Sequence, residues 1–296
     1  MISTFLFAFA AGCSSGTAAD SAAAPGAAAS ASLRPPPHKA KLDKGRMFKD
    51  GCIVKGRNTS ARGCVYGDRR SDVTVALVGD SHALQYGPPM IELAGQRGWK
   101  LLALARADCV VAQVRFKRPC DAWRRKAMKR IRKARPDMVV VSSSTGSQFR
   151  VKRRGARLTR RASEPVLRKG MARTMRKLAR FKSKRGVRAK VVLLRDQALA
   201  PFRPPDCLKK KANRRKPSRC GFKAKRPSST AFDFHGARRV KAVQIIDPMK
   251  LLCPKGWCRS VDRGLIVYRD RYHYTATWAA TMAPWLGRRM GGLRQR

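Results

Sequence analysis

A buried strand that runs directly into a tight turn and a helix is the feature that most constrains the fold of this chain. Residues 74–86 read Thr-Val-Ala-Leu-Val-Gly-Asp-Ser-His-Ala-Leu-Gln-Tyr. The apolar run 75–78 has the length and composition of a strand buried on both faces, which is typical of a parallel sheet. Gly79 permits an unusual turn, and Ser81 then lies where the next helix starts. Strands and helices alternate along the rest of the chain, so we predict an α/β fold whose parallel sheet is covered on both faces.

Ser81 is expected to lie among the unpaired backbone N–H groups of a first helical turn. Such groups can stabilise an oxyanion if the serine hydroxyl attacks a carbonyl carbon. Asp80 and Ser81 are also residue types that commonly cap helices, so this turn alone leaves a purely structural role open.

A second polar loop, near the other end of the chain, favours the catalytic interpretation. Residues 267–275 read Val-Tyr-Arg-Asp-Arg-Tyr-His-Tyr-Thr, which is a strand end followed by a helix start. A serine nucleophile needs a base, and the base needs an orienting carboxylate; His273 and Asp270 supply these two groups. The chain has only four histidines, and each of the two turns holds one of them. We therefore predict that Ser81, Asp270 and His273 meet at the carboxyl ends of the strands.

These motifs resemble the SGNH hydrolase superfamily, whose first block is GDS and whose last block is DxxH. Over about residues 50–290 the chain resembles one branch, the SGNH domain fused behind membrane acyltransferase family 3 proteins that O-acylate surface polysaccharides. The resemblance implies a flavodoxin-like three-layer αβα sandwich with a central parallel sheet of about five strands. It rests on Gly79-Asp80-Ser81-His82, Cys109, Asp196-Gln197-Ala198, Pro205-Asp206-Cys207, Leu252-Cys253-Pro254 with Cys258, and Tyr268-Arg269-Asp270 to His273 and Thr275.

The resemblance also implies where oxyanion donors should lie. The backbone N–H of Ser81 is the first candidate. The second block of the superfamily supplies a backbone donor from the loop after the second strand, where this chain has Asp108 and lacks the usual glycine. The third block supplies an asparagine, and Ser144 and Thr145 stand in that region instead. Either hydroxyl is a candidate replacement, and a plain serine-rich turn is the alternative.

Eight of the nine cysteines form four neighbouring pairs along the sequence. Loop-closure entropy favours pairing between near neighbours, and disulfides persist outside the cytosol. A zinc site is the competing explanation, although no histidine lies close to these cysteines in sequence. The favoured pairs are Cys52 with Cys64, Cys109 with Cys120, Cys207 with Cys220, and Cys253 with Cys258.

The first 45 residues differ in composition from the rest of the chain. Residues 1–13 are a short apolar run that is too short to span a bilayer and is typical of a secretion signal. The sequence Ala10-Ala11-Gly12-Cys13 resembles a lipobox, which makes Cys13 a candidate for lipidation. Residues 14–45 are expected to be a disordered Ala/Ser/Pro-rich tether, and residues 46–296 the SGNH domain. We therefore expect a secreted or cell-envelope protein, anchored to the outer face of the plasma membrane if Cys13 carries lipid.

The charge of the chain is extreme, with 68 Lys plus Arg against 17 Asp plus Glu and a net charge of +51. Such a field attracts polyanions and raises the rate of encounter with them. Residues 150–226 contain 30 basic residues and three acidic ones, which makes this stretch the best candidate for a polyanion-binding face. The alternative is a compositional bias spread over a solvated surface. Anionic glycans and anionic lipid head groups are the expected kinds of contact, and no specific nucleic acid is expected.

Together, the residues and the resemblance predict an extracytoplasmic serine acyl-ester enzyme. It would be an O-acetyl(acyl)transferase or an esterase acting on cell-surface polysaccharide or another acylated glycan, with a separate membrane acyl-donor protein as a partner for transfer. Ser81 would attack, His273 would act as base and then acid, and Asp270 would orient the imidazole. This chemistry needs neither a cofactor nor a metal. The alternative is a noncatalytic basic domain that binds anionic glycan, a membrane surface or nucleic acid.

Overall fold

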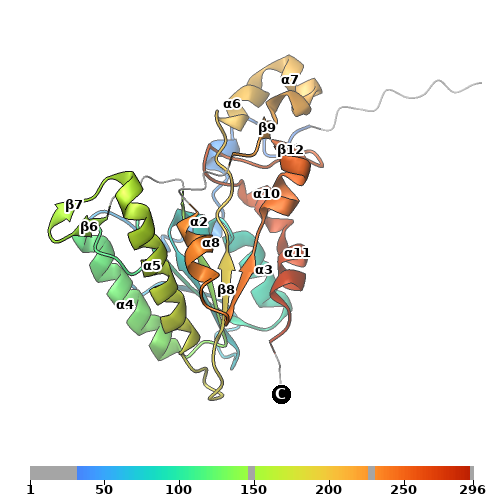
Figure 1. Ribbon diagram of the computed structural model, residues 1–296. Coiled ribbons are helices and arrows are strands. Elements are labelled where there is room, and N and C mark those ends of the chain that lie inside the picture. Colours follow the sequence, from blue (N-terminus) through green and yellow to red (C-terminus); the bar gives the residue numbers. More distant parts are fainter. Residues whose placement is uncertain (1–31, 146–150, 226–230, 294–296) are drawn as a thin grey trace, which may run out of the picture. The chain divides into compact units, whose positions relative to one another are not determined.

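A seven-stranded sheet lies at the centre of the structure (Figure 1). The computed structural model describes residues 32–145, 151–225 and 231–293, so the expected signal segment 1–13 with Cys13 lies outside the described residues. The strand order is β1-β4-β3-β5-β8-β10, and β2 also pairs with β4. The strands are β1 (Ile53–Val54), β2 (Cys64–Gly67), β3 (Thr74–Gly79), β4 (Lys100–Arg106), β5 (Met138–Ser142), β8 (Lys190–Leu194) and β10 (Val243–Ile246).

The interiors of the central strands β3, β4, β5 and β8 are apolar because both faces of the sheet are covered. Successive side chains point to opposite faces, so Val75 and Leu77 join one core cluster while Ala76 and Val78 join the other. Helices α3, α10 and α11 pack on the first face, and α4, α5 and α8 on the second (Figure 1). The helices are α1 (Arg46–Lys49), α2 (Ser81–Leu84), α3 (Gly87–Gln96), α4 (Arg118–Ala134), α5 (Arg160–Ala179), α6 (Pro204–Lys209), α7 (Lys211–Arg215), α8 (Phe232–Ala237), α9 (Met249–Leu252), α10 (Ala276–Ala280) and α11 (Ala283–Met290).

This arrangement confirms the predicted three-layer αβα sandwich. Taken in chain order, the five main parallel strands β3, β4, β5, β8 and β10 are arranged 2-1-3-4-5, which is the flavodoxin-like order. The direction in which strands are added reverses beside β3. Ligands bind at such a reversal, outside the carboxyl ends of the strands, and the turn that carries Ser81 follows β3 directly.

The sheet has two more strands than expected, and both lie along the outer edge of β4. Strand β1 pairs in parallel with residues 105–106 of β4, and β2 pairs antiparallel with residues 100–103. A disulfide between Cys52 and Cys64 joins the two edge segments. Short edge strands of this kind depend on the neighbouring strand and on the covalent link, so their own sequence carries little signal.

The helical segment that starts after the loop of His273 is divided into two helices. Helix α10 ends at Ala280 and α11 starts at Ala283, with Pro284 in the first turn of α11. Proline has no N–H to donate and fits the first turn of a helix, so it ends the helix before it and starts the next one.

Residues 32–45 pack on the domain, although the sequence places them in a disordered tether. The backbone of Arg34 pairs with the edge of a hairpin, donating to the carbonyl of Gly264 at 2.9 Å and accepting from the N–H of Ile266 at 2.8 Å. Ala40 is fully buried against Leu208 and its neighbours. Within the described residues, these contacts extend the folded part back to Arg34. They also bring this segment beside the loop that holds His273.

The remaining regular elements are short. They are the 3-10 helices η1 (Ala40–Leu42), η2 (Pro217–Cys220) and η4 (Pro254–Gly256), and the hairpins β6 (Lys152–Arg153) with β7 (Ala156–Arg157), β9 (Phe222–Lys223) with β11 (Trp257–Cys258), and β12 (Val261–Asp262) with β13 (Leu265–Ile266). None of the helices in the described part of the chain combines the length and the apolar character needed to cross a bilayer.

The described part of the chain contains four disulfides, and each joins two cysteines that are near neighbours in sequence. They take up the eight cysteines for which zinc was the competing explanation, so those sulfurs are not available as metal ligands. The compartment is therefore an oxidising one outside the cytosol. The pairs are Cys52–Cys64, Cys109–Cys120, Cys207–Cys220 and Cys253–Cys258.

Candidate active site

The turn between β3 and α2 presents Ser81. At Gly79 an added Cβ would lie 1.8 Å from the carbonyl oxygen of Ser142 on β5, so only glycine fits. The glycine is thus required by the close approach of the neighbouring strand and not by the unusual backbone turn expected from sequence. Asp80 caps α2 by accepting a 2.9 Å hydrogen bond from the N–H of His82. Ser81 is the first residue of this helix and is only partly buried.

The loop between β13 and α10 holds Asp270 and His273 in a fixed relation. Oδ1 of Asp270 accepts hydrogen bonds from the backbone N–H groups of Tyr272 at 2.7 Å and His273 at 2.8 Å. At the end of the loop the Thr275 side chain caps α10 by accepting from the N–H of Trp278 at 3.2 Å. The loop is therefore shaped by its own backbone and by the start of the next helix.

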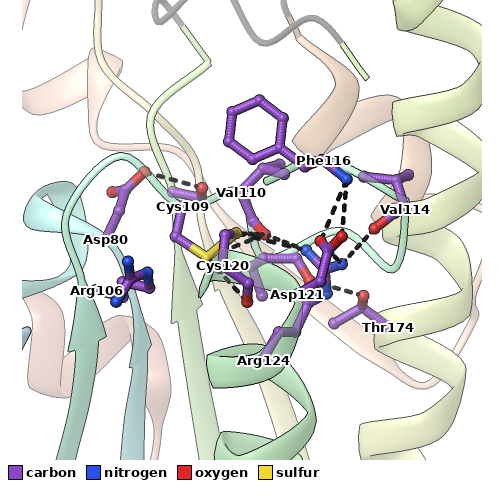
Figure 2. The surroundings of a disulfide bond; sticks show 12 residues. Asp80, Arg106, Cys109, Val110, Val114, Phe116, Cys120, Asp121, Arg124 and Thr174 are labelled. Carbon is purple, nitrogen blue, oxygen red and sulfur yellow. Dashed lines mark hydrogen bonds and ion pairs between the residues drawn. A yellow bond between two sulfur atoms is a disulfide. The ribbon is translucent and has the colours of Figure 1, made fainter. Parts of the chain in front are cut away.

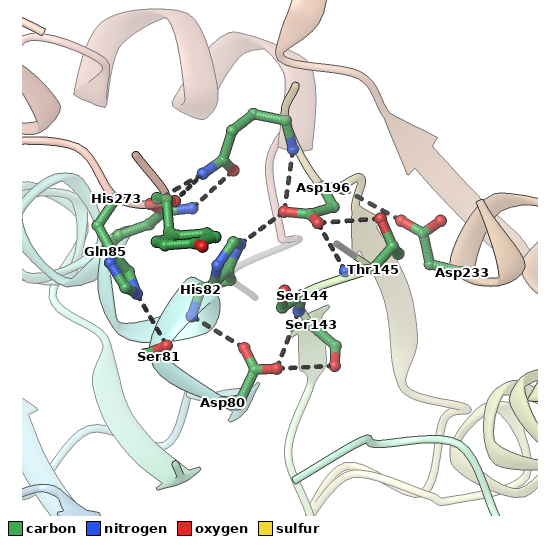
Figure 3. A network of polar contacts seen from close by, with 12 residues as sticks. Asp80, Ser81, His82, Gln85, Ser143, Ser144, Thr145, Asp196, Asp233 and His273 are labelled. Atoms are coloured by element: carbon green, nitrogen blue, oxygen red, sulfur yellow. Dashed lines mark hydrogen bonds and ion pairs between the residues drawn. The ribbon is translucent and has the colours of Figure 1, made fainter. Parts of the chain in front are cut away.

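The two loops meet, and the three predicted side chains form a series. Oγ of Ser81 lies 2.9 Å from Nε2 of His273 (Figure 3). On the other side of the ring, Nδ1 of His273 lies 2.9 Å from Oδ2 and 3.0 Å from Oδ1 of Asp270. A carboxylate can only accept, so Nδ1 carries the proton and Nε2 is left to accept the proton of the serine hydroxyl. This is the arrangement in which an imidazole can act as a base toward a serine.

Electrostatics keep the two ionisable members of the series in suitable charge states. Burial of Asp270 opposes its ionisation, but the hydrogen bond from His273 and the charge of Arg269 outweigh burial and lower the pKa of Asp270 to about 2. Burial lowers the pKa of His273; the hydrogen bond to Asp270 opposes this, and the nearby charge of His82 lowers the pKa again. At neutral pH the carboxylate is therefore charged and the imidazole is neutral.

A second histidine and aspartate pair lies beside the first, and sequence reasoning gave it no role. Nδ1 of His82 lies 2.6 Å from Oδ1 of Asp196, which follows β8, and both side chains are almost fully buried (Figure 3). The rings of His82 and His273 are in edge contact, with centroids 5.0 Å apart. One available signal was the position of Asp196 directly after a buried strand, at the sheet edge where parallel strands place reactive groups.

The candidate oxyanion donors differ in the groups to which they are hydrogen-bonded. Both donors of Thr145 are bound to Oδ2 of Asp196, the N–H at 2.6 Å and the hydroxyl at 3.0 Å, so the expectation that this hydroxyl faces an oxyanion is wrong for this structure. The backbone N–H of Ser144 donates to Oδ2 of Asp80 at 2.9 Å. The Ser144 hydroxyl and the backbone N–H groups of Ser81 and Asp108 stay predictions. Asp108 is exposed and has a left-handed backbone, with φ 50°.

The loop after Asp108 is pinned at several points (Figure 2). The Cys109–Cys120 disulfide ties its start to α4. The nearly buried Arg124 donates to the carbonyl of Val110 at 3.0 Å and also binds the carbonyl of Val114. The same guanidinium pairs with Asp121 at 2.7 Å, which removes the cost of burying an unpaired charge. The backbone near Asp108 is therefore held against α4.

A cavity of about 460 Å³ adjoins the loop that carries His273. Asp270 and the exposed Tyr272, which flank His273, lie in its wall. The other lining residues come from the segment 32–45, from the region of α6 and from the loop of His273 itself, and most of the charged ones are cations. They are Pro37, His38, Lys41, Arg203, Pro205, Asp206, Lys209, Arg269 and Arg271.

The model of a protein family described as "SGNH domain (fused to AT3 domains)" matches residues 51–287. No curated protein sequence matches. The periplasmic domain of a lipopolysaccharide acetyltransferase from Salmonella ser. Paratyphi A is similar in structure, with a TM-score of 0.57 and 13% identity over 88% of this chain and 98% of that chain. This likeness shows a shared fold.

Two further solved structures are more distantly similar. A carbohydrate esterase family 2 enzyme from Corynascus thermopiles (Myceliophthora fergusii) has a TM-score of 0.42 and 16% identity over 74% of this chain and 66% of that chain. A carbohydrate acetylesterase from Sinorhizobium meliloti has a TM-score of 0.40 and 15% identity over 72% of this chain and 98% of that chain.

Proposed function

The chain belongs to the family of SGNH domains that occur fused to AT3 domains, and from this membership we propose that it is a serine enzyme that transfers or hydrolyses acyl esters on a cell-surface glycan. The observation that carries the proposal is the 2.9 Å contact between Oγ of Ser81 and Nε2 of His273, with Asp270 on the far side of the ring. Ser81 precedes Asp270 by 189 positions and His273 by 192 positions in the sequence. A helix cap would not require this convergence.

In the first half of the reaction, the Ser81 hydroxyl attacks the carbonyl carbon of an acyl ester and its proton passes to Nε2 of His273. The carboxylate of Asp270 stabilises the imidazolium that results. The negative charge on the former carbonyl oxygen is stabilised by the backbone N–H of Ser81, with Ser144 and the Asp108 region as further candidate donors. His273 then returns the proton to the departing alkoxide oxygen, and the acyl group remains on Ser81.

In the second half, the acceptor decides the kind of enzyme. A water molecule or a sugar hydroxyl gives its proton to His273 and attacks the acyl carbon, and the Ser81 oxygen leaves and regains a proton from His273. Water as acceptor makes the enzyme an esterase, and a sugar hydroxyl makes it an O-acyltransferase. Incubating the pure protein with an acetyl ester and an oligosaccharide, and comparing free acetate with O-acetylated sugar by mass spectrometry, distinguishes the two.

The reactive serine itself is tested by labelling. A serine-directed fluorophosphonate should attach to Ser81, and the modified peptide identifies the site by mass mapping. Label on other residues only, or none, would contradict catalysis by this serine. It would leave the noncatalytic basic domain as the better account of the chain.

The cavity beside His273 supports a substrate that is both carbohydrate and anionic. Tyr272 is 42% exposed and offers an aromatic face to a sugar ring at the rim. Of the two acids in the wall, Asp206 pairs with Lys209 at 2.9 Å and Asp270 is bonded to His273. The remaining cations, among them Arg203 and Lys41, suit the carboxylate or phosphate groups of an acidic glycan.

Replacing two of these cations should therefore weaken substrate binding selectively. For the variant Lys41→Gln/Arg203→Gln we expect KM for an acetylated oligouronate to rise about fivefold at low salt, because two exposed charge contacts are lost. The kcat value should not change. Turnover of the uncharged substrate p-nitrophenyl acetate should be unaffected.

The control for this variant removes the same charge elsewhere. Arg239→Gln/Lys241→Gln changes two exposed cations at the amino end of β10, whereas the cavity lies near the carboxyl ends of the strands. An equal rise in KM in both variants would show that only the overall charge of the protein matters and that the cavity holds no subsite.

The pH dependence of kcat/KM should follow the ionisation of His273. The neutral imidazole is the active form, so activity is lost as pH falls through its pKa. Because that pKa is lowered, the loss should occur at more acidic pH than the ordinary imidazole value of 6.5. Asp270, with a pKa of about 2, should stay charged across the range. Hydrolysis of p-nitrophenyl acetate from about pH 4 to pH 9 measures the profile. An acid midpoint above 6.5 would contradict the assignment.

The proposal also covers location and partners. Secretion through the segment 1–13, lipidation of Cys13, and a tether ahead of the folded domain would hold the enzyme at the outer face of the membrane. There a membrane acyl-donor protein would supply the acyl group. Mass analysis of the mature N-terminus, compared with a Cys13→Ser variant, tests the anchor.

A further inference from the structure

The buried side chains of His82 and Asp196 are paired by a 2.6 Å hydrogen bond, and the ring of His82 contacts the ring of the proposed base. Asp196 accepts hydrogen bonds from Thr145 on Oδ2 and from the N–H of Gln197 on Oδ1 at 3.0 Å, besides its contact with His82. Because both oxygens of Asp196 accept hydrogen bonds, the side chain is an ionised carboxylate. A carboxylate with a side-chain exposure of 2% needs a cation beside it, and His82 provides one.

The groups around His82 agree with a positive charge on its ring. Carboxyl groups face it from three elements: Asp80 on its own turn, Asp196 after β8, and Asp270 in the loop before α10. Asp233 on α8 accepts the N–H of Asp196 at 3.1 Å, and burial followed by the charge of Asp196 raises the pKa of Asp233 to about 6.

Arg195 and His82 are basic groups whose charges act on this cluster of carboxyl groups. The guanidinium of Arg195 pairs with Asp247 at 2.6 Å, and the ring of His82 contacts Asp196. Burial lowers the pKa of His82, but the charge of Asp196 and the hydrogen bond to it outweigh burial and raise that pKa to about 9.

The same region also clamps the backbone on both sides of His273. Oε1 of Gln85 accepts the N–H of Tyr274 at 3.2 Å, and the side-chain amide of Gln197 donates to the carbonyl of Tyr272. The two glutamines are joined by a 2.9 Å hydrogen bond from Gln85 Nε2 to Gln197 Oε1. Gln85 follows His82 on the same helical turn, and Gln197 follows Asp196. The ion pair thus fixes the position of both glutamines and, through them, of the imidazole.

We propose that His82, held as an imidazolium by Asp196, is a positioning residue that keeps His273 neutral and aligned with Ser81. The inference rests on the proposed function. The edge of the His82 ring contacts the His273 ring. Whenever His273 takes a proton, two positive rings therefore lie with their centroids 5.0 Å apart. Repulsion at this distance keeps His273 free to accept the serine proton, and it makes the protonated His273 a stronger acid toward the leaving oxygen.

The informative variant removes the charges and keeps the hydrogen bond. In His82→Gln/Asp196→Asn the two amides can pair at the same place, whereas His82→Gln alone would leave a buried carboxylate without its cation and is expected to fold poorly. We expect the double variant to fold, with the acid limb of its kcat/KM profile moved to higher pH. A rise of one unit in the pKa of His273 lowers its neutral fraction by up to about a factor of ten on the acid limb. At a fixed acidic pH we therefore expect kcat/KM, relative to its plateau, to be lower on the order of threefold or more in the double variant.

A direct measurement separates this inference from the proposed function. With 15N-labelled histidine, NMR titration reports each ring; single substitutions assign His38, His235 and His273, and the remaining signal belongs to His82. We expect His82 to stay protonated through neutral pH, and His273 to titrate at higher pH in the double variant than in the native protein. This readout does not depend on turnover, so it remains decisive if no substrate is hydrolysed.

The control is His235→Gln, which changes a partly exposed histidine on α8 and should leave both the profile and the titration of His273 unchanged. A neutral His82 at pH 7 overturns the inference. So does an unchanged titration of His273 in a folded double variant, because a merely structural pair would alter stability and leave the basicity of His273 as it was.

Discussion

Ser81→Ala is expected to lower kcat for p-nitrophenyl acetate by a factor of about 10⁴ or more. The hydroxyl is the group that His273 Nε2 contacts at 2.9 Å, and no acyl enzyme can form without it. The substitution should remove the nucleophile without lowering the stability of the fold. Ser81 lies on the surface side of the turn, partly exposed, and alanine is a good residue for the helix that it starts.

A matched serine substitution distinguishes loss of the nucleophile from general damage. Ser218→Ala removes an exposed hydroxyl on η2 and should leave kcat unchanged. Thermal unfolding of both variants should match that of the native protein within a few degrees. Equal rates for native protein and Ser81→Ala would falsify the proposed nucleophile on this substrate.

Asp196→Ala is expected to cost about 3–5 kcal/mol of folding free energy, the usual effect of removing one partner of a buried ion pair. The change leaves the His82 imidazolium buried without its closest carboxylate, and it removes the acceptor of both Thr145 donors. Urea denaturation followed by circular dichroism measures the difference, with disulfides kept intact. Asp196→Asn, which keeps one acceptor oxygen, should lose less. A cost below about 1 kcal/mol for the alanine variant would show that the pair is not a buried ion pair.

The same pair should give the native protein a characteristic dependence of stability on pH. The folded-state pKa of His82, about 9, lies above its ordinary value of 6.5, so its contribution is fully present below pH 6.5 and is lost as pH rises through 9. The unfolding free energy of native protein minus that of Asp196→Ala should therefore shrink over this window. A constant difference across it would contradict a charged His82.

Sequence reasoning located the central elements of the fold because their signals are local. The continuous apolar run of β3 indicates a strand buried on both faces, and the alternation of strands and helices along the chain indicates a parallel sheet. It failed where structure depends on a neighbour: β1 and β2 exist only as edges of β4. Residues 32–45 are likewise held by contacts with the domain, such as the backbone pairing of Arg34 with the edge of a hairpin. Their Ala- and Pro-rich composition does not indicate this pairing.

The residues of the candidate site were likewise predicted only in part. Ser81, Asp270 and His273 stand in short motifs whose chemistry can be read directly, and the structure brings them within hydrogen-bond reach. The contact between His82 and Asp196 joins residues 114 positions apart that belong to no common motif. Thr145, one of the two hydroxyls considered as oxyanion donors, donates to Asp196 in this structure, and the sequence gives no signal of that contact. Long-range polar pairs of this kind follow from the packing of strand ends, which a single sequence does not specify.

The spacing of the disulfides has a consequence for how the protein matures. Each of the four bridges joins cysteines no more than 13 residues apart, and no bridge encloses another. During export, a chain that emerges N-terminus first presents both sulfurs of one pair before the next pair arrives. Oxidation can thus proceed in order of emergence, so that the right partner is always the nearest one and little reshuffling by an isomerase is needed.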